Sequence, residues 1–143
     1  MIALVYTYLD HPSDVYVHVT NETLDGVFED AAMATFEVML KTSKVLAKKT
    51  ITAELEADDL EQLLYMWIDH LLFIFDAKSF ALNRADVIVS KGPKKPSLTA
   101  KIYGEAYDPK RHGLKVAVKA MTYSLMKISQ TGNKWESYFV LDI

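Results

Sequence analysis

The amino-acid sequence predicts an α+β fold in which two helices pack on one face of a mostly antiparallel mixed sheet. Two segments carry apolar residues at spacings of three and four, which is the period of an amphipathic helix. The other segments alternate apolar and polar residues, which is typical of half-buried strands. Because the helices and strands are segregated along the chain, we expect both helices to cover the same face of the sheet.

The first helix is expected over residues 24–40 and the second over residues 60–75. Thr23, and either Asp58 or Asp59, stand where a side-chain oxygen can accept a hydrogen bond from a free amide at the start of a helix. A glycine inside the first helix weakens it by up to ~1 kcal/mol relative to alanine. Packing must therefore stabilise that segment.

Alternation with a period of two predicts five strands ahead of the C-terminal region, at residues 15–19, 51–57, 87–89, 98–102 and 114–121. Gly and Pro residues in the segment 91–96 mark a turn between the third and fourth of these strands. A further pair of strands, residues 125–128 and 135–141, flanks Thr131-Gly132-Asn133, which is typical of a three-residue hairpin loop.

Length, composition and charge limit the classes of protein that remain. We expect one domain over residues 1–143, because this length matches a single core. The absence of cysteine excludes disulfides and thiolate zinc sites. A net charge of −3 argues against bulk RNA or DNA binding. Residues 60–75 are too short to span a bilayer, and residues 1–5 lack the basic region of a signal peptide, so we expect a cytoplasmic protein. The sequence does not determine the oligomeric state, and a monomer is the default expectation.

Two acidic clusters stand out, since no phosphate-binding loop, nucleophile elbow or zinc-protease motif is present. The first is the loop Asp10-His11-Pro12-Ser13-Asp14, where carboxylates and an imidazole could bind a hard cation or could simply bond to turn amides. The second is Asp142 with the terminal carboxylate of Ile143, two adjacent negative charges that a cation or a lysine would stabilise. The alternative for the second cluster is a solvated tail.

Other polar residues have plainer interpretations. Lys115 and Lys119 share one face of the predicted 114–121 strand, where lysines usually protect an edge. His112, in a polar loop, could act as a switch or a ligand, but a lone histidine in a loop is more often simply exposed, and exposure is what we expect. Four lysines in the loop after the first helix are interpreted as solvated: Lys41, Lys44, Lys48 and Lys49.

Taken together, these motifs resemble the archease family over essentially the whole chain. The N-terminal Tyr8-Leu9-Asp10-His11-Pro12-Ser13-Asp14 is similar to the family's D-H-T-A-D signature, with Pro12 and Ser13 in place of Thr and Ala. The other matching segments are 28–37, Asp58-Asp59-Leu60, 67–76, Gly104-Glu105 with Asp108 and His112, 118–123, and the terminal Val140-Leu141-Asp142-Ile143. The chain has Ser124 where some members carry His.

The resemblance implies a protein cofactor of the RtcB-type tRNA-splicing RNA ligase, not an enzyme. Such a cofactor promotes guanylylation of the ligase and its multiple turnover. The family's metal ligands correspond to Asp14, Asp142 and the terminal carboxylate of Ile143, and its functional lysine corresponds to Lys119. Asp10 and His11 are candidates to orient these ligands. Oxygen donors of this kind suit a divalent calcium, magnesium or manganese ion. We expect the protein to meet RNA only through the ligase.

Two other functions remain open at this point. The same carboxylates could activate water in a small metal-dependent hydrolase. A general chaperone would instead need a sizeable exposed apolar surface. The methionines at periodic positions are more simply interpreted as core residues: Met33, Met39, Met66, Met121 and Met126.

Overall fold

Eight strands and three helices make up the part of the chain that this computed structural model describes, residues 6–9 and 14–143. In chain order the elements are β1 (Tyr6–Leu9), β2 (Asp14–Asn21), α1 (Leu24–Met39), the 3₁₀ turn η1 (Thr42–Lys44), β3 (Lys49–Glu56), α2 (Leu60–Lys78), β4 (Phe80–Ser90), β5 (Ser97–Ala106), α3 (Pro109–His112), β6 (Ala120–Met121), β7 (Lys127–Thr131) and β8 (Lys134–Asp142).

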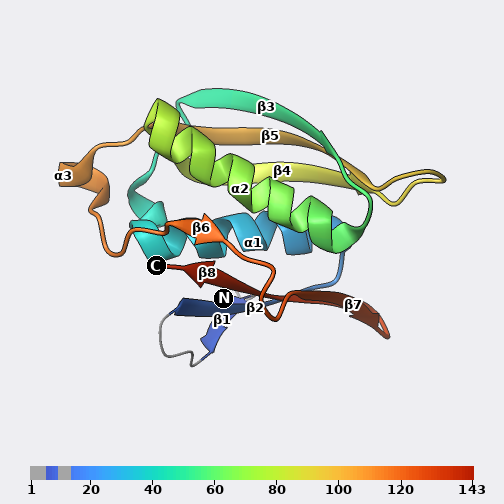
Figure 1. The fold of residues 1–143 in the computed structure, drawn as a ribbon. Helices are drawn as coiled ribbons and strands as arrows, with labels where there is room; N and C mark the ends of the chain where they lie inside the picture. Colours follow the sequence, from blue (N-terminus) through green and yellow to red (C-terminus); the bar gives the residue numbers. More distant parts are fainter. Residues whose placement is uncertain (1–5, 10–13) are drawn as a thin grey trace.

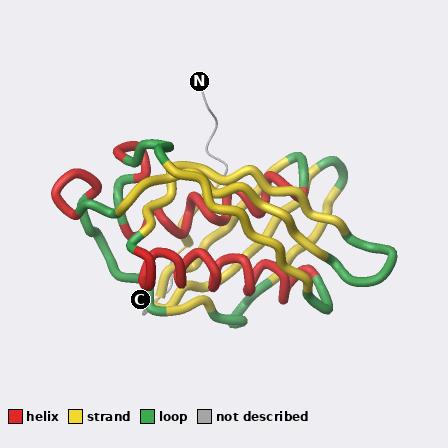
Figure 2. The backbone as a smooth tube through the Cα atoms, turned by 90° about the horizontal axis from the view of Figure 1, so that it is seen from above, coloured by secondary structure: helices red, strands yellow, loops and turns green. Residues whose placement is uncertain are grey.

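The strands form two antiparallel sheets, with α1 and α2 between them (Figure 1). One sheet has the order β1-β2-β8-β6, with β7 also paired to β8, and the other has the order β3-β5-β4. Both helices contact strands of both sheets, and they lie side by side (Figure 2). The predicted α+β class, with antiparallel pairing and two helices, is confirmed; the single mixed sheet is replaced by two sheets. All the described strand pairs are antiparallel.

The division into two sheets follows from the packing of α1. This helix has no broad polar face, because buried side chains surround most of its circumference. Ala31, Ala32 and Ala34 are fully buried. Such small side chains let strands approach the helix from two sides, so one helix can fill the space between two sheets.

Both predicted N-caps are confirmed. The hydroxyl of Thr23 accepts a hydrogen bond from the Gly26 amide at 3.0 Å, and the carboxylate of Asp59 accepts one from the Gln62 amide at 2.7 Å. The indole of Trp67 on α2 donates to the carbonyl of Phe28 on α1 at 2.9 Å. This buried bond fixes one helix against the other, since an unmatched indole N–H in the core would cost free energy.

The exposed backbone edge of β4 is covered by acidic side chains of α1. Asp25 accepts a hydrogen bond from the Val89 amide at 2.8 Å, and Glu29 accepts one from the Val87 amide at 2.9 Å. These bonds satisfy N–H groups that an edge strand would otherwise present to another chain. Burial raises the pKa of Glu29 above its usual value, and the bond from Val87 opposes that change.

The predicted strand at residues 114–121 is wrong over most of its length. Only Ala120 and Met121 pair, opposite Asp142 and Leu141 of β8. Strand β8 ends at Asp142, so residues 114–119 have no further length of β8 beside them. The Lys115 amide donates instead to the Met39 carbonyl at 2.7 Å. The other predicted strands are confirmed with longer or shifted ends, and the 125–128 strand begins at Lys127.

The methionines are core residues, as predicted. Met39 and Met121 are buried, and Met33, Met66 and Met126 are half-buried against the core. Within residues 6–9 and 14–143, no helix combines the length and the apolar character needed to cross a membrane.

Candidate functional site

Two aspartates far apart in sequence face each other at the end of the five-stranded sheet. Strand β8 lies between β2 and β6, and Asp142 is the partner of Asp14 on one side and of Ala120 on the other. Side chains directly opposite each other on antiparallel strands project from the same face, with Cβ atoms about 5 Å apart. Both aspartates are half-buried. The fold therefore brings together the two carboxylates that the sequence singled out.

The last residue is held against the body of the protein. Ile143 is half-buried and packs against the hydrophobic core. Ile143 follows Asp142 directly, so its main chain continues from the end of β8. This arrangement is the ordered terminus that the apolar character of residues 139–143 predicts.

The main chain of Lys119 lies next to Asp142. Its amide donates to the Asp142 carbonyl at 2.8 Å, immediately before β6 begins. Its side chain is exposed, and no carboxylate of the described residues lies within 4 Å of its ammonium group. The main chain of Lys119 therefore lies next to Asp142, and its ammonium group forms no ion pair with a described carboxylate.

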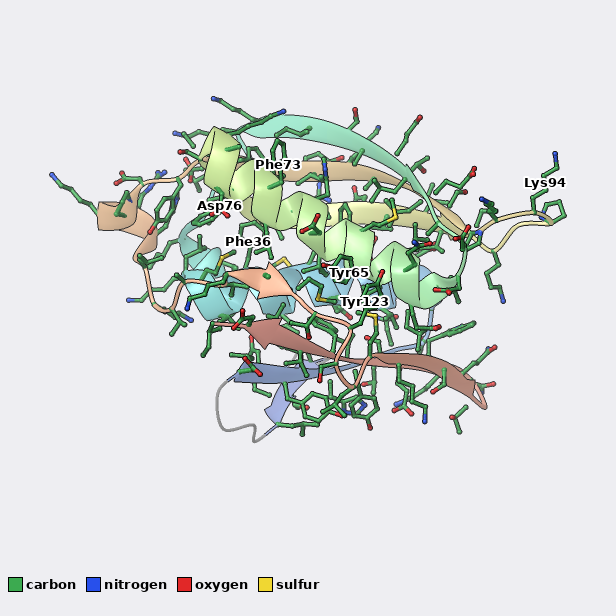
Figure 3. All side chains as sticks on the ribbon, in the orientation of Figure 1. Phe36, Tyr65, Phe73, Asp76, Lys94 and Tyr123 are labelled. Carbon is green, nitrogen blue, oxygen red and sulfur yellow. The ribbon has the colours of Figure 1, made fainter. Side chains whose placement is uncertain are left out.

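The approach of β6 to the rest of the fold is fixed by aromatic stacking. The ring of Tyr123, just after β6, lies on the ring of Tyr65 from α2, with centroids 4.2 Å apart and planes 6° from parallel (Figure 3). The hydroxyl of Thr122 donates to the carbonyl of Val140 at 3.0 Å. These contacts position the short β6 strand, and with it Lys119, against β8.

Asp10 and His11, the predicted orienting residues, lie outside the described residues. Within residues 6–9 and 14–143, no group of three or more His, Asp or Glu side chains is arranged to hold a metal ion. Among the described residues, Asp14 and Asp142 offer two side-chain carboxylates at this end of the sheet, which we call the acidic tip. Such an all-oxygen set suits a hard divalent cation, with further ligands coming from water, main-chain carbonyls or a partner.

A buried ionic network that sequence reasoning missed lies near η1. Glu105 is only 4% exposed, and its carboxylate accepts hydrogen bonds from the Leu46 amide at 2.7 Å and from His112 at 3.0 Å, beside Arg111. The bond from Leu46, with the histidine and the guanidinium, lowers the pKa of Glu105 to about 2. The expectation that His112 is exposed is wrong, because its ring is fully buried.

The tautomer of His112 follows from its two partners. The Asp108 amide donates to Nδ1 at 3.0 Å, so Nδ1 is an acceptor and Nε2 carries the proton directed at Glu105.

Gly104, which precedes Glu105, is required by close packing: a Cβ atom there would lie 1.9 Å from the Ala81 carbonyl oxygen. The alternation of β5 buries Leu98, Ala100, Ile102 and Gly104 and would place Glu105 on the exposed face, so the period of this strand gave no signal of the network.

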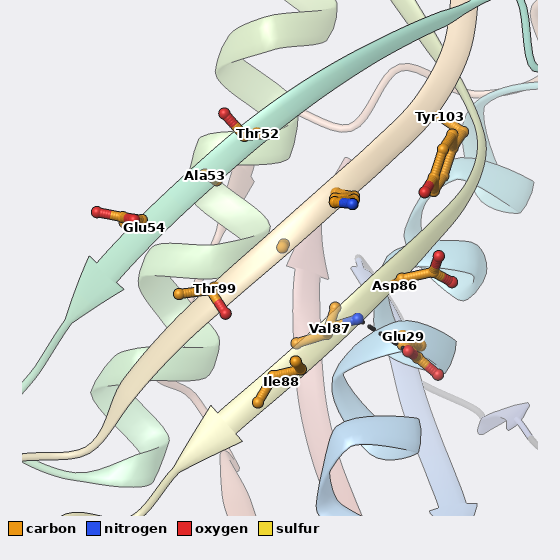
Figure 4. Close-up of a pocket in the computed structure, with 11 residues that line it drawn as sticks. Glu29, Thr52, Ala53, Glu54, Asp86, Val87, Ile88, Thr99 and Tyr103 are labelled. Carbon is orange, nitrogen blue, oxygen red and sulfur yellow. Dashed lines mark hydrogen bonds between the residues drawn. The ribbon is translucent and has the colours of Figure 1, made fainter.

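A separate cavity of about 420 Å³ lies on the outer face of the three-stranded sheet (Figure 4). Polar residues of β3, β4 and β5 line it, among them Thr52, Asp86 and Lys101. None of its lining residues comes from β2, β6 or β8, so it is not part of the Asp14–Asp142 site.

Comparisons with known proteins agree on one family. A profile described as the Archease protein family (MTH1598/TM1083) matches residues 6–143. The chain is 40% identical over 139 residues to "Protein archease" of Pyrobaculum neutrophilum, covering 96% of this chain and 95% of that protein. It is 38% identical to "Protein archease" of Sulfurisphaera tokodaii, covering 96% and 98% of the two chains.

A solved structure has the same fold. The solution structure of Methanobacterium thermoautotrophicum protein 1598 superimposes with a TM-score of 0.83 at 30% sequence identity. The match covers 97% of this chain and 99% of that chain. The likeness therefore includes both sheets and the two long helices.

Proposed function

The chain belongs to the archease family, and on that premise we propose that it activates an RNA ligase of the RtcB type. Family membership supports the role of an RNA-ligase activator in general terms. We propose more specifically that the protein promotes guanylylation of the ligase and allows repeated turnover during tRNA splicing or RNA repair in the cytoplasm. In this role it is a protein cofactor and not itself a catalyst.

The observation that supports this proposal most strongly is the pairing of Asp14 with Asp142. The register of β2 and β8 makes these two aspartates direct partners, so their side chains project from the same face of the sheet. Placing like charges side by side costs stability unless a cation balances them. A site of this composition is better suited to binding a cation than to packing the fold.

We propose that Asp14, Asp142 and the terminal carboxylate of Ile143 hold a divalent calcium, magnesium or manganese ion. The ion would supply positive charge toward phosphate oxygens at the ligase's nucleotide site, where catalysis depends mainly on positioning and charge stabilisation. Lys119 would offset the remaining negative charge, and Asp10 and His11 would orient the carboxylates.

Ligation under limiting ligase tests the role of activator. We expect RNA product to accumulate far beyond one equivalent per ligase when this protein is present, and to stop near one equivalent when it is absent. Equal product in both reactions would contradict the proposal. Hydrolysis of phosphoesters by the protein alone with Mn²⁺ would instead support a metal-dependent hydrolase.

A further inference from the structure

Positive charge is concentrated in two segments of the chain, residues 41–49 and 105–116. They contain seven of the sixteen Lys and Arg residues but only two of the nineteen Asp and Glu residues. The seven cations are Lys41, Lys44, Lys48, Lys49, Lys110, Arg111 and Lys115. The net charge of −3 is therefore the sum of a basic region and a strongly acidic remainder. We call the two segments together the basic end.

The fold joins the two segments through hydrogen bonds. The Lys41 amide donates to the His112 carbonyl at 3.0 Å, and the Lys48 amide donates to the Gly104 carbonyl at 2.9 Å. The Leu46 amide donates to the buried Glu105 carboxylate at 2.7 Å. Segments about sixty residues apart in sequence thus form one surface, at the same end of the molecule as the C-terminus (Figure 1).

Four of these cations have no counter-charge in the described part of the chain. Lys41, Lys44, Lys49 and Lys110 are exposed, and no described carboxylate lies within 4 Å of their ammonium groups. The other three cations share the carboxylates of Glu105 and Glu37. A cation just beyond a helix C-terminus gains typically ~0.3 to 1 kcal/mol from the helix dipole. That effect accounts for one lysine after α1 and not for seven cations.

The composition of the basic end favours phosphate over a protein partner. Lysine is depleted from the centres of protein–protein interfaces, whereas it is a regular contact for phosphate oxygens. The aromatic rings available for stacking on bases are few: Tyr107 is half-buried between Phe75 and His112, and His112 is buried. Contacts here would therefore reach the phosphodiester backbone and not the bases.

We propose that the basic end binds the backbone of single-stranded RNA directly and without sequence preference. The proposal goes beyond the activator role: the choice of RNA among phosphate polymers rests on the proposed function, whereas the binding itself needs no ligase. The chain runs from Lys115 through residues 116–119 to Lys119, which bonds to Asp142. RNA on the basic end would thus lie next to the acidic tip. This proposal differs from the sequence-based expectation that RNA is met only through the ligase.

The test is equilibrium binding of a fluorescently labelled single-stranded RNA to the full chain by anisotropy, at several salt concentrations. Four lysine contacts predict that log affinity falls with log salt with a slope of about −3. The triple variant Lys41→Glu/Lys44→Glu/Lys110→Glu should bind at least about tenfold more weakly. A matched control, Lys94→Glu/Lys127→Glu/Lys134→Glu, alters three exposed lysines outside the basic end and should change affinity by less than about threefold.

Several results would overturn the proposal. The proposal is wrong if the unmodified protein does not bind RNA at low salt. It is also wrong if the two triple variants lose RNA affinity equally. Loss of ligase binding by the first triple variant in the absence of RNA, with no RNA binding by the unmodified protein, would mean that the basic end docks a protein. Circular dichroism checks folding. If the triple variant is unfolded, Lys44→Glu and Lys110→Glu singly should each weaken binding by about twofold to fourfold.

Discussion

At the residue scale, Gly26 shows how a distant side chain can change the effect of a helix glycine. Helix propensity alone favours alanine there by up to ~1 kcal/mol. In the structure, however, a Cβ atom at this position would lie 2.2 Å from the amide oxygen of Asn21. Asn21 cannot move freely, because it accepts from the Thr23 amide at 3.0 Å and donates to Asp30 at 2.7 Å.

We therefore predict that Gly26→Ala destabilises the protein by about 1 kcal/mol, because overpacking outweighs the gain in propensity. In the Asn21→Ala background the same substitution should become stabilising. Urea unfolding of the four proteins in this double-mutant cycle measures both effects. Stabilisation by Gly26→Ala in the otherwise unmodified chain would show that Asn21 does not restrict the site.

The residue scale also shows what local sequence determines. The caps Thr23 and Asp59 were predictable because they depend on bonds to amides three residues away. The burial of His112 was not predictable, because its partner Glu105 becomes buried only when β5 meets the loop after η1. A histidine's neighbours along the chain do not reveal such a partner.

At the scale of elements, the Glu105 network holds α3 and the loop after η1 against β5. A carboxyl group whose pKa is lower in the folded state stabilises the fold above its unfolded pKa of about 4.3. That stabilisation disappears as pH falls toward the folded value of about 2. Stability should therefore depend on Glu105 at neutral pH and cease to depend on it in acid.

We predict that Glu105→Gln lowers the thermal unfolding midpoint at pH 7, and that its difference from the unmodified protein narrows between about pH 4 and pH 2. Thermal unfolding followed by circular dichroism across this pH range measures the difference. Glu54→Gln, which alters an exposed carboxylate of β3, is the matched control and should have little effect. A difference that stays constant down to pH 2 would show that the charge of Glu105 is not the cause.

Elements differ in how far their sequence determines them. The period-two alternation of β3 and β5 predicted both strands, and the structure pairs them along their length. Residues 114–119 show the same alternation but form no strand, because the neighbouring β8 has already ended at Asp142. Alternation along the sequence indicates which side chains can be buried, whereas the pairing of a strand also depends on the length of the distant strand beside it.

At the scale of the whole molecule, the two sheets enclose the helices and place Asp14 and Asp142 together at one end. Asp14 and Asp142 meet there because β2 pairs with β8, a contact between opposite ends of the chain. The acidic composition of the two termini predicted that they could form a site, and family resemblance supplied the pairing. Neither composition nor periodicity could give the order β1-β2-β8-β6, which non-local packing determines.

The same scale shows what a single net charge leaves out. A single value of −3 hides the separation between the basic end and the acidic remainder. The separation becomes visible only when hydrogen bonds between residues 41–48 and 104–112 join two lysine-containing segments. Cations and carboxylates then lie at the same end of the molecule.

The most direct test of the central claim is the rate of ligase guanylylation with GTP and Mn²⁺, measured without RNA. We predict that Asp142→Asn, which removes one carboxylate from the acidic tip, lowers the stimulated rate at least about tenfold. Glu136→Gln, which alters a carboxylate six residues earlier on β8, should keep the rate within about twofold of the unmodified protein. A folded Asp142→Asn protein that stimulates guanylylation fully would contradict the account.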